Sequence, residues 1–383
     1  MRTLTSLQPR RMVFGSGCLT DALDYIASFP KARIHLVSSP SQRMTIAFMR
    51  DALGASGFTV TADDTIAAEP TLAAFANALQ KAKHADPTCV VGLGGGSPLD
   101  VAKLVAAFLR NDQKIEDAFG INLLKGRNCH LICIPTTAGT GSEVSPNAIL
   151  LDETARLKKG VISPYLVPDA TFIDPELTRS LPSRVTAVTG MDTLTHCIEA
   201  YTNKFAHPLV DLYALEGIRL CATFLARAVA DANDMEAREG MARASLYGGL
   251  CLGPVNTAAV HALAYPLGGE FHVPHGLSNA VLLPAVFRFN SEASPDRHAA
   301  VALALGVKQR TNISETSQEG ANALAALSQL CGLDCDLRSY GVVSETVPRM
   351  AEMAMTVTRL LRNNPRELTH ADAERLYRES LNL

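Results

Sequence analysis

The feature that most constrains the fold is a change of pattern about halfway along the chain. In the first half, short apolar and β-branched runs alternate with helical segments; the runs are residues 33–38, 57–61, 88–93, 130–134 and 170–173. The run Thr88–Leu93 (TCVVGL) is apolar throughout, which is typical of a parallel strand buried on both faces. Strands that alternate with helices build a largely parallel sheet with helices on both faces.

Beyond Thr178–Ser183 the strand signals stop and helical periods continue to the end of the chain. The helical segments are residues 185–201, 210–231, 236–253, 258–265, 277–289, 294–306, 317–331, 347–362 and 371–381. A chain of 383 residues is long enough for two domains. We therefore predict a Rossmann-like α/β dinucleotide-binding domain over 1–182, with a mostly parallel sheet, and an all-helical metal-binding and substrate domain over 183–383.

Composition excludes several classes of partner. The net charge is −3 and charged residues make up 19%, which argues against nucleic acid and anionic membranes. Apolar runs such as Leu104–Leu109 are too short to cross a bilayer, and Met1–Arg10 has no signal-peptide pattern. The nine cysteines contain no Cys-x-x-Cys pair, so we expect reduced thiols in a cytoplasmic protein.

A strand runs into three glycines and then into a helix at Val91–Lys103 (VGLGGGSPLDVAK). The order predicts Ser97 as the N-cap, Pro98 as the first helical residue and Asp100 near a capping box. Glycines allow close approach of the backbone, and a helix N-terminus favours phosphate. The loop matches neither a Walker A loop nor G-x-G-x-x-G, so a tight turn used only for packing remains the alternative.

A second loop, Pro135–Ser145 (PTTAGTGSEVS), follows another apolar strand and is rich in hydroxyls and small residues. Its N–H and hydroxyl groups suit pyrophosphate, ribose or a carboxamide, although an ordinary Ser/Thr-rich turn would read the same way. Two such loops at the carboxyl ends of parallel strands favour a ligand site, because open α/β sheets bind ligands at that edge.

In the helical half, one aspartate and three histidines are candidate metal ligands. Asp192 and His196 are four residues apart, which places both side chains on one face of a helix, and His261 and His275 follow later. This mixed oxygen and nitrogen set suits a divalent first-row metal. The simpler interpretation is that each histidine is a hydrogen-bonded core residue and that the Asp–His pair lies on a helix surface.

These motifs occur together, in order and nearly end to end, in a way that resembles the iron-containing (group III) alcohol dehydrogenase family. The motifs are Phe14–Gly17 (FGSG), Gly94–Lys103 (GGGSPLDVAK), Pro135–Val144 (PTTAGTGSEV), Asp174–Leu177 (DPEL), Gly190–Tyr201 (GMDTLTHCIEAY), His261–Ala262 (HA) and Pro274–Gly276 (PHG).

The resemblance implies a dehydroquinate-synthase-like architecture, a catalytic metal and a nicotinamide cofactor in the cleft between the two domains. It places the metal ligands, and through them catalysis, on Asp192, His196, His261 and His275. It places the cofactor positions on Gly95, Gly96, Ser97, Asp100, Thr136, Thr137, Thr140, Ser142 and Lys158. The implied cofactors are Fe²⁺, with Zn²⁺ as a substitute, and NAD.

Three positions depart from the family pattern. A turn with Ser39 at its centre replaces the aspartate that excludes a 2′-phosphate, so Ser39 joins the cofactor set, NADP is not excluded, and Arg43 is a candidate phosphate partner. Tyr265 stands where many relatives have a second histidine. The Ser39 turn and the Asn256–Gly269 stretch also resemble the maleylacetate reductase branch, which often has asparagine in place of the first metal ligand, whereas Asp192 favours metal-dependent chemistry.

The expected reaction is hydride transfer between the nicotinamide and a small alcohol, aldehyde or ketone. His272, three residues before His275, is a candidate proton relay. The alternatives are a maleylacetate-reductase-like reduction of an unsaturated keto acid, a zinc-dependent relative of glycerol dehydrogenase and, from another class, a non-catalytic nucleotide-binding protein. We expect a homodimer or a larger homo-oligomer.

Overall fold

A computed structural model describes residues 2–30, 32–66 and 69–381 of the chain. Two compact units are present: an α/β unit of Ser6–Thr137 and Gly141–Arg179, and a helical unit of the residues up to Thr5, Ala138–Thr140 and Ser180 onward. The three residues Ala138–Thr140 therefore belong to the helical unit, although they lie in the middle of the predicted α/β domain. The domain boundaries 1–182 and 183–383 stay a prediction.

The α/β unit is built on a six-stranded sheet with the order β1-β9-β6-β4-β2-β3, in which every neighbouring pair is parallel. Its strands are β1 (Arg11–Phe14), β2 (Arg33–Ser38), β3 (Thr59–Asp63), β4 (Cys89–Gly94), β6 (His130–Pro135) and β9 (Ala170–Ile173). A second sheet contains β5 (Gly120–Ile121), β8 (Leu157–Ile162) and β7 (Asn147–Asp152), with β7 and β8 antiparallel. The predicted, mostly parallel α/β architecture is confirmed.

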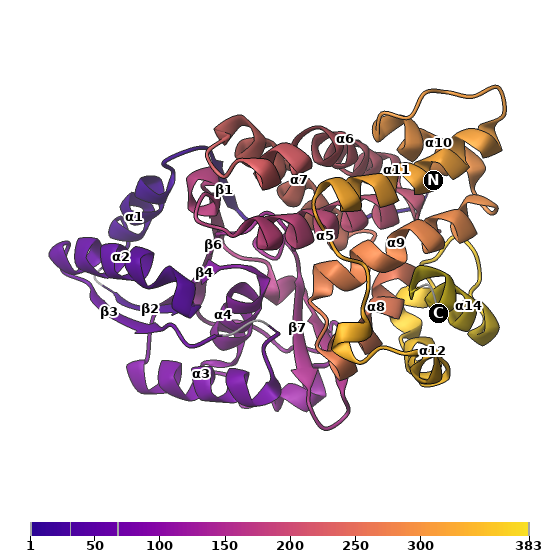
Figure 1. The fold of residues 1–383 in the computed structure, drawn as a ribbon. Helices are drawn as coiled ribbons and strands as arrows, with labels where there is room; N and C mark the ends of the chain where they lie inside the picture. Colours follow the sequence, from indigo (N-terminus) through magenta and orange to yellow (C-terminus); the bar gives the residue numbers. More distant parts are fainter. Residues whose placement is uncertain (1, 31, 67–68, 382–383) are drawn as a thin grey trace. The chain divides into compact units, whose positions relative to one another are not determined.

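Helices cover both faces of the six-stranded sheet because alternate strand residues point to opposite sides. The helices are α1 (Leu19–Ala27), α2 (Arg43–Ala55), α3 (Leu72–Ala85) and α4 (Gly96–Phe108). On β2, Ile34 and Leu36 share a core with α1 and α2, whereas Val37 shares a core with α3 and α4. Figure 1 shows α1 and α2 on one side of this sheet and α3 on the other.

Some predicted element bounds are wrong. The strand predicted over 57–61 begins two residues later at Thr59, because Gly57 has a left-handed φ of +86° and belongs to the preceding turn. The single helix predicted over 347–362 is two helices, α12 (Val347–Met355) and α13 (Thr358–Leu361). The break falls at Val357, whose ψ of 50° lies outside the helical region, within a run of three β-branched residues.

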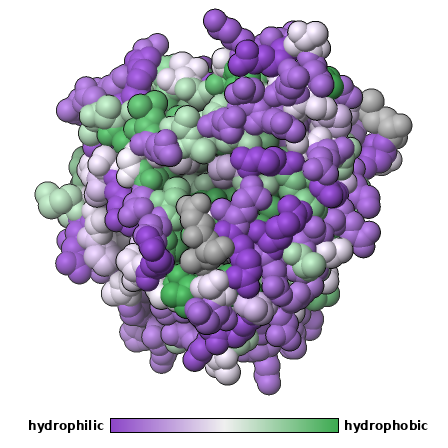
Figure 2. All heavy atoms as spheres, turned by 45° about the vertical axis from the view of Figure 1, so that its right-hand side comes forward, coloured by the Kyte–Doolittle hydropathy of each residue, from purple (hydrophilic) through white to green (hydrophobic). Residues whose placement is uncertain are grey.

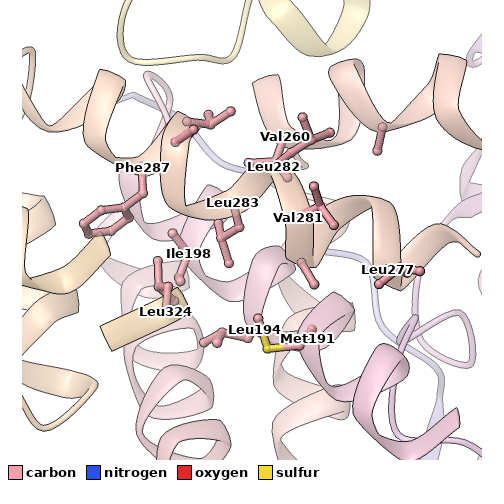
Figure 3. Packing of buried hydrophobic residues seen from close by; sticks show 14 of the residues in the cluster. Met191, Leu194, Ile198, Val260, Leu277, Val281, Leu282, Leu283, Phe287 and Leu324 are labelled. Atoms are coloured by element: carbon pink, nitrogen blue, oxygen red, sulfur yellow. The ribbon is translucent and has the colours of Figure 1, made fainter. Parts of the chain in front are cut away.

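The described part of the helical unit contains helices joined by loops and no strand. They are α5 (Ser183–Thr202), α6 (Pro208–Ala230), α7 (Met235–Leu252), α8 (Ala259–Phe271), α9 (His275–Ser291), α10 (Pro295–Ala304), α11 (Ile313–Leu330), α12, α13 and α14 (His370–Leu381), with two short 3-10 turns. Figure 3 shows one core in which Leu194 of α5, Val260 of α8, Leu283 of α9 and Leu324 of α11 converge. This core fixes α5, α8 and α9 relative to one another.

Hydrophilic residues cover much of the face drawn in Figure 2, with hydrophobic residues between them. Within the described ranges, the structure contains no helix that is both long enough and apolar enough to cross a membrane.

Candidate active site

Helix α5 carries the first two candidate ligands in a buried setting. Almost every residue from Gly190 to Ala200 is buried, so α5 is packed on all sides and the Asp192–His196 pair is not a surface pair. The side chains of Asp192 and His196 are 5% and 7% exposed, and His196 Nε2 lies 3.7 Å from Asp192 Oδ1. A charge buried to this extent needs partners of opposite charge or a metal ion.

The other two histidines come from α8 and from the first residue of α9. Both His261 Nε2 and His275 Nε2 lie 3.6 Å from Asp192 Oδ1. The approach of α9 to α5 depends on Gly276, because a Cβ there would lie 1.9 Å from the carbonyl oxygen of Val188. A glycine next to His275 therefore allows that imidazole to reach the aspartate.

The structure brings three of these donors into one group and places the fourth, His196, beside it. One ligand atom from each of Asp192, His261 and His275 lies within 4.8 Å of the other two. His196 joins them through its contact with Asp192 and through its ring, which stacks on that of His261 with centroids 4.8 Å apart. Their role as metal ligands stays a prediction.

Glu199 is a member of the site that the sequence analysis missed. Its Oε2 lies 2.6 Å from Nδ1 of His261, and its Oε1 accepts the backbone N–H of Val260 at 2.6 Å. In the neutral imidazole this carboxylate holds the proton on Nδ1, which leaves the Nε2 lone pair of His261 directed at the ligand set. A signal was present in the sequence, since Glu199 is an acidic residue one turn after His196 on the same helix.

The charges of the site reinforce one another. Burial alone would raise the pKa of Asp192, but the neighbouring His196, His275 and His261 hold it well below its usual value. Burial likewise opposes protonation of His261, but Glu199 and Asp192 outweigh it and raise its pKa to about 9. Burial lowers the pKa of His196. The site thus keeps its aspartate ionised and favours positive charge around it.

The donor set fits a divalent metal ion. A four-coordinate ion with bonds of about 2.1 Å separates its ligand atoms by about 3.4 Å. The separations of 3.6 and 3.7 Å between Asp192 Oδ1 and the three Nε2 atoms are close to this spacing. Of the four residues, Asp192, His261 and His275 form the group whose ligand atoms all lie within 4.8 Å of one another. Imidazole nitrogens with one carboxylate oxygen suit Fe²⁺ and Zn²⁺ alike.

The glycine loop of the α/β unit differs in detail from its prediction. Ser97 is not the N-cap: α4 begins at Gly96, and Gly95 caps it without a side-chain hydrogen bond. The helix starts early because Gly94, at φ +145°, turns the chain directly out of β4, where a Cβ would lie 2.9 Å from Pro98. The first-turn N–H groups of α4 thus have no side-chain cap, which suits an anion.

The capping-box role predicted for Asp100 is also wrong, because its carboxylate faces inward. It accepts hydrogen bonds from Ser142 Oγ at 2.5 Å and from the N–H of Ile149 at 2.9 Å. The fully buried Lys103 donates to Ser142 Oγ at 2.9 Å and to the carbonyl of Asn147 at 2.6 Å. Lys103 therefore links α4 to the second loop and to the start of β7 by hydrogen bonds.

Burial shifts the pKa values of this pair in opposite directions, since it raises that of Asp100 and lowers that of Lys103. The mutual attraction of the two charges opposes both shifts.

The predicted cofactor residues Ser97 and Lys158 are linked through Glu69, which the sequence analysis did not consider. The N–H of Glu69 donates to Ser97 Oγ at 3.2 Å, and its Oε1 accepts from Lys158 Nζ at 2.7 Å. The second loop lies beside the first, because the Thr136 N–H donates to the Gly94 carbonyl at 2.9 Å.

Thr137 and Thr140 complete the predicted cofactor positions of the second loop. A Cβ on Gly95 would lie 3.2 Å from the Thr137 side chain, which places this threonine against the glycine loop. Thr140 lies in the short segment that belongs to the helical unit. Cofactor contacts of all these residues stay a prediction.

The remaining candidates have these surroundings. Ser39 Oγ hydrogen-bonds to Ser41 Oγ at 2.8 Å, and Arg43 Nε pairs with Asp64 at 2.6 Å. Tyr265 is buried on α8, with its hydroxyl 3.5 Å from Arg359. His272 is exposed at the left-handed C-cap of α8, and its role as a relay stays a prediction.

Comparison with known families settles which scaffold this is. Residues 9–175 match the family described as "Iron-containing alcohol dehydrogenase", and residues 186–381 match "Fe-containing alcohol dehydrogenase family, C-terminal". The chain belongs to the iron-containing alcohol dehydrogenase family. The resemblance inferred from the motifs is thereby confirmed for this family, whereas the branch of maleylacetate reductases stays a prediction.

Individual members of the iron-containing alcohol dehydrogenase family agree with this assignment. Long-chain-alcohol dehydrogenase 1 of Geobacillus thermodenitrificans is 38% identical over 325 residues, which cover 84% of this chain and 82% of the relative. The crystal structure of a 1,3-propanediol oxidoreductase superposes with a TM-score of 0.93 at 31% identity, over 99% of this chain and 100% of the other.

A sulfoacetaldehyde reductase from Bifidobacterium kashiwanohense, solved in complex with NAD⁺, superposes with a TM-score of 0.88 at 27% identity, over 100% of this chain and 99% of the other. All three relatives are oxidoreductases of alcohols or aldehydes by name. The prediction of alcohol/aldehyde oxidoreduction is therefore confirmed at the level of reaction class.

Proposed function

We propose that this protein is a metal-dependent alcohol dehydrogenase that transfers a hydride between NAD and a small alcohol or aldehyde. The observation that carries the proposal is the convergence of the buried Asp192 and His261 with the half-buried His275 in the helical unit, beside the buried His196. A buried carboxylate facing three imidazoles is costly without a cation and is the donor set that the chemistry requires.

The side chains around this centre have separate tasks. Asp192 supplies negative charge, and the three imidazoles present neutral nitrogen donors once a cation is bound. Glu199 fixes the tautomer and the ring orientation of His261 through its 2.6 Å contact with Nδ1. A bound divalent ion supplies Lewis acidity, which stabilises negative charge on the substrate oxygen.

On the cofactor side, we propose that the uncapped N-terminus of α4 holds the pyrophosphate, with Lys158 and the hydroxyls of the second loop as further contacts. We favour NAD over NADP for two reasons. A structural relative binds NAD⁺. Arg43, the cation nearest the Ser39 turn in sequence, is already paired with Asp64, and a 2′-phosphate would compete with that carboxylate.

A comparison of kcat/KM for NAD⁺ and NADP⁺ tests the cofactor preference. We expect the ratio to favour NAD⁺ and to move toward NADP⁺ in Asp64→Asn, which frees Arg43.

The alternatives have less support. The related proteins act on alcohols and aldehydes by name, which favours that chemistry over reduction of an unsaturated keto acid. A protein that only binds nucleotides would have no need of a buried Asp/His donor set.

His261→Ala tests the proposal directly. We expect turnover to fall to background and the metal content to fall with it, while NAD⁺ binding stays close to that of the parent. His370→Ala, which removes an exposed imidazole from α14, is the matched control and should change neither quantity. A His261→Ala enzyme with its rate and metal content intact would show that the ligand assignment is wrong.

We further propose a cytoplasmic location and a homodimer or larger assembly. The nine cysteines are all free thiols, eight of them buried, as expected in a reducing compartment. Native mass spectrometry of the purified protein tests the assembly.

A further inference from the structure

A second buried side chain beside the donor set has a role that the four ligands do not explain. Asn279 follows His275 by one helical turn on α9, so both side chains project from the same face. It is 0% exposed. Its Nδ2 lies 2.7 Å from Asp192 Oδ1, 3.3 Å from His261 Nε2 and 3.5 Å from His275 Nε2.

The amide of Asn279 is only half satisfied. Its NH₂ group donates to Asp192, whereas its carbonyl oxygen Oδ1 is buried and has no hydrogen-bond partner among the described residues. A buried polar atom without a partner costs free energy and calls for an explanation. The missing partner must be a group that binds oxygen and is itself absent from the protein chain.

A divalent cation is such a group, and it would reverse the preference of the amide. The NH₂ hydrogens carry partial positive charge, so they stabilise a metal-free carboxylate but repel a cation at the same place. An asparagine carbonyl is a good oxygen ligand for hard divalent cations. The terminal torsion of asparagine is broad and roughly two-fold, so a half-turn exchanges nitrogen and oxygen within the same volume.

We propose that Asn279 is a metal-responsive positioning residue of this centre, resting on the metal site proposed above. In the metal-free chain its NH₂ group holds Asp192 beside the imidazoles. When a divalent cation binds, the amide turns and its carbonyl oxygen faces the cation. Asn279 thus keeps the donors gathered before the metal arrives and adds an oxygen afterwards.

Zn²⁺ alone is the probe, and competition with a chromophoric chelator at constant pH measures its affinity for the metal-free full-length protein. Asn279→Leu removes both amide groups at similar volume and should weaken Zn²⁺ binding by about 10- to 100-fold, as the loss of supporting groups around a metal does. Asn279→Asp restores an oxygen and should bind Zn²⁺ at least as tightly as the parent.

The matched control lies on the same helix. Asn290 of α9 is also buried, and it exchanges hydrogen bonds with Asn364 away from the donor set. Asn290→Leu should lower thermal stability but leave Zn²⁺ affinity within about threefold of the parent, because distant sites act independently. Equal losses of affinity in the two leucine variants would mean that the effect is general destabilisation, and the proposal would be overturned.

The outcomes separate this proposal from the proposed function. Stoichiometric Zn²⁺ binding by the parent with unchanged affinity in Asn279→Leu overturns the role of Asn279 and leaves the metal site standing. No Zn²⁺ binding by the parent overturns both. Because Asn279→Asp buries a second carboxylate beside Asp192, which lowers stability, a measurement on the parent is added.

That measurement follows the side-chain amide signals of the parent labelled with ¹⁵N-asparagine during titration with Zn²⁺. We expect the Asn279 pair to shift at one equivalent while the Asn290 pair does not. An Asn279 signal that is unchanged at saturating Zn²⁺ overturns the proposal.

Discussion

Replacement of Glu199 by glutamine isolates the contribution of a carboxylate that touches the candidate metal centre without belonging to it. The two oxygens of Glu199 accept two different hydrogens, from Nδ1 of His261 and from the N–H of Val260, each at 2.6 Å. Glutamine has the same shape but only one acceptor oxygen. One of the two donors must then face an NH₂ group.

The consequence for His261 follows from its tautomers. An NH₂ group opposite Nδ1 favours the imidazole with its proton on Nε2, which removes the lone pair that a metal needs. Loss of such a carboxylate–histidine contact typically costs 10- to 100-fold in metal affinity, which is about 1.4–2.8 kcal/mol. The exposure of only 5% and 6% of the two side chains gives water little access to replace the lost acceptor.

The assay is Zn²⁺ affinity by chelator competition, read together with the thermal stability of the metal-free protein. Glu239→Gln is the control, because Glu239 is exposed on α7 of the same unit. The reasoning is refuted if Glu199→Gln binds Zn²⁺ within about threefold of the parent, since the carboxylate would then contribute little to the ligand.

Two further predictions concern stability. Lys103→Met leaves the Asp100 charge without its cation, so we expect the free energy of unfolding, measured in urea, to fall by about 3–5 kcal/mol and the affinity for NAD⁺ to fall with it. Lys83→Met, on the exposed surface of α3, should change neither quantity. A loss below about 1 kcal/mol in Lys103→Met would contradict a stabilising role of the Lys103–Asp100 pair. Burial lowers the pKa of His298 from 6.5 to about 4, so the unfolded chain takes up the proton first and stability must fall as pH drops below 6.5, by about 2 kcal/mol at pH 5. His298→Gln should lack this component, and equal pH dependence of the urea midpoints of parent and variant would contradict it.

Much of the scaffold follows from local sequence. The strands β2 and β9 have the predicted bounds, because apolar β-branched runs flanked by turn residues form strands wherever the sheet places them. Helical periods of 15 residues and more also identified α5 and α6 within a few residues. The donor residues Asp192, His196, His261 and His275 could be nominated because imidazoles and carboxylates are the side chains that bind metals.

Local patterns failed where the partner of a residue is distant in the chain. Ser97 has the chemistry of an N-cap, but the helix begins earlier because Gly94 turns the backbone, and Ser97 instead accepts from Glu69. Asp100 has the spacing of a capping box, yet it bonds to Ser142 and Ile149. Each of these outcomes depends on which loops the sheet brings together.

The sequence by itself determined the alternation that builds a parallel sheet and the helical second half, since each is set by spacing within one segment. It also nominated the candidate metal-binding side chains, through their chemistry and the motifs in which they occur. Only the tertiary structure decided that Glu199 and Asn279 surround the donors. Their contacts join helices more than 60 and 80 residues apart in the chain. Packing of α5, α8 and α9 creates those contacts, because a hydrogen bond requires atoms to meet in space, and periodicity along one helix carries no information about its neighbours.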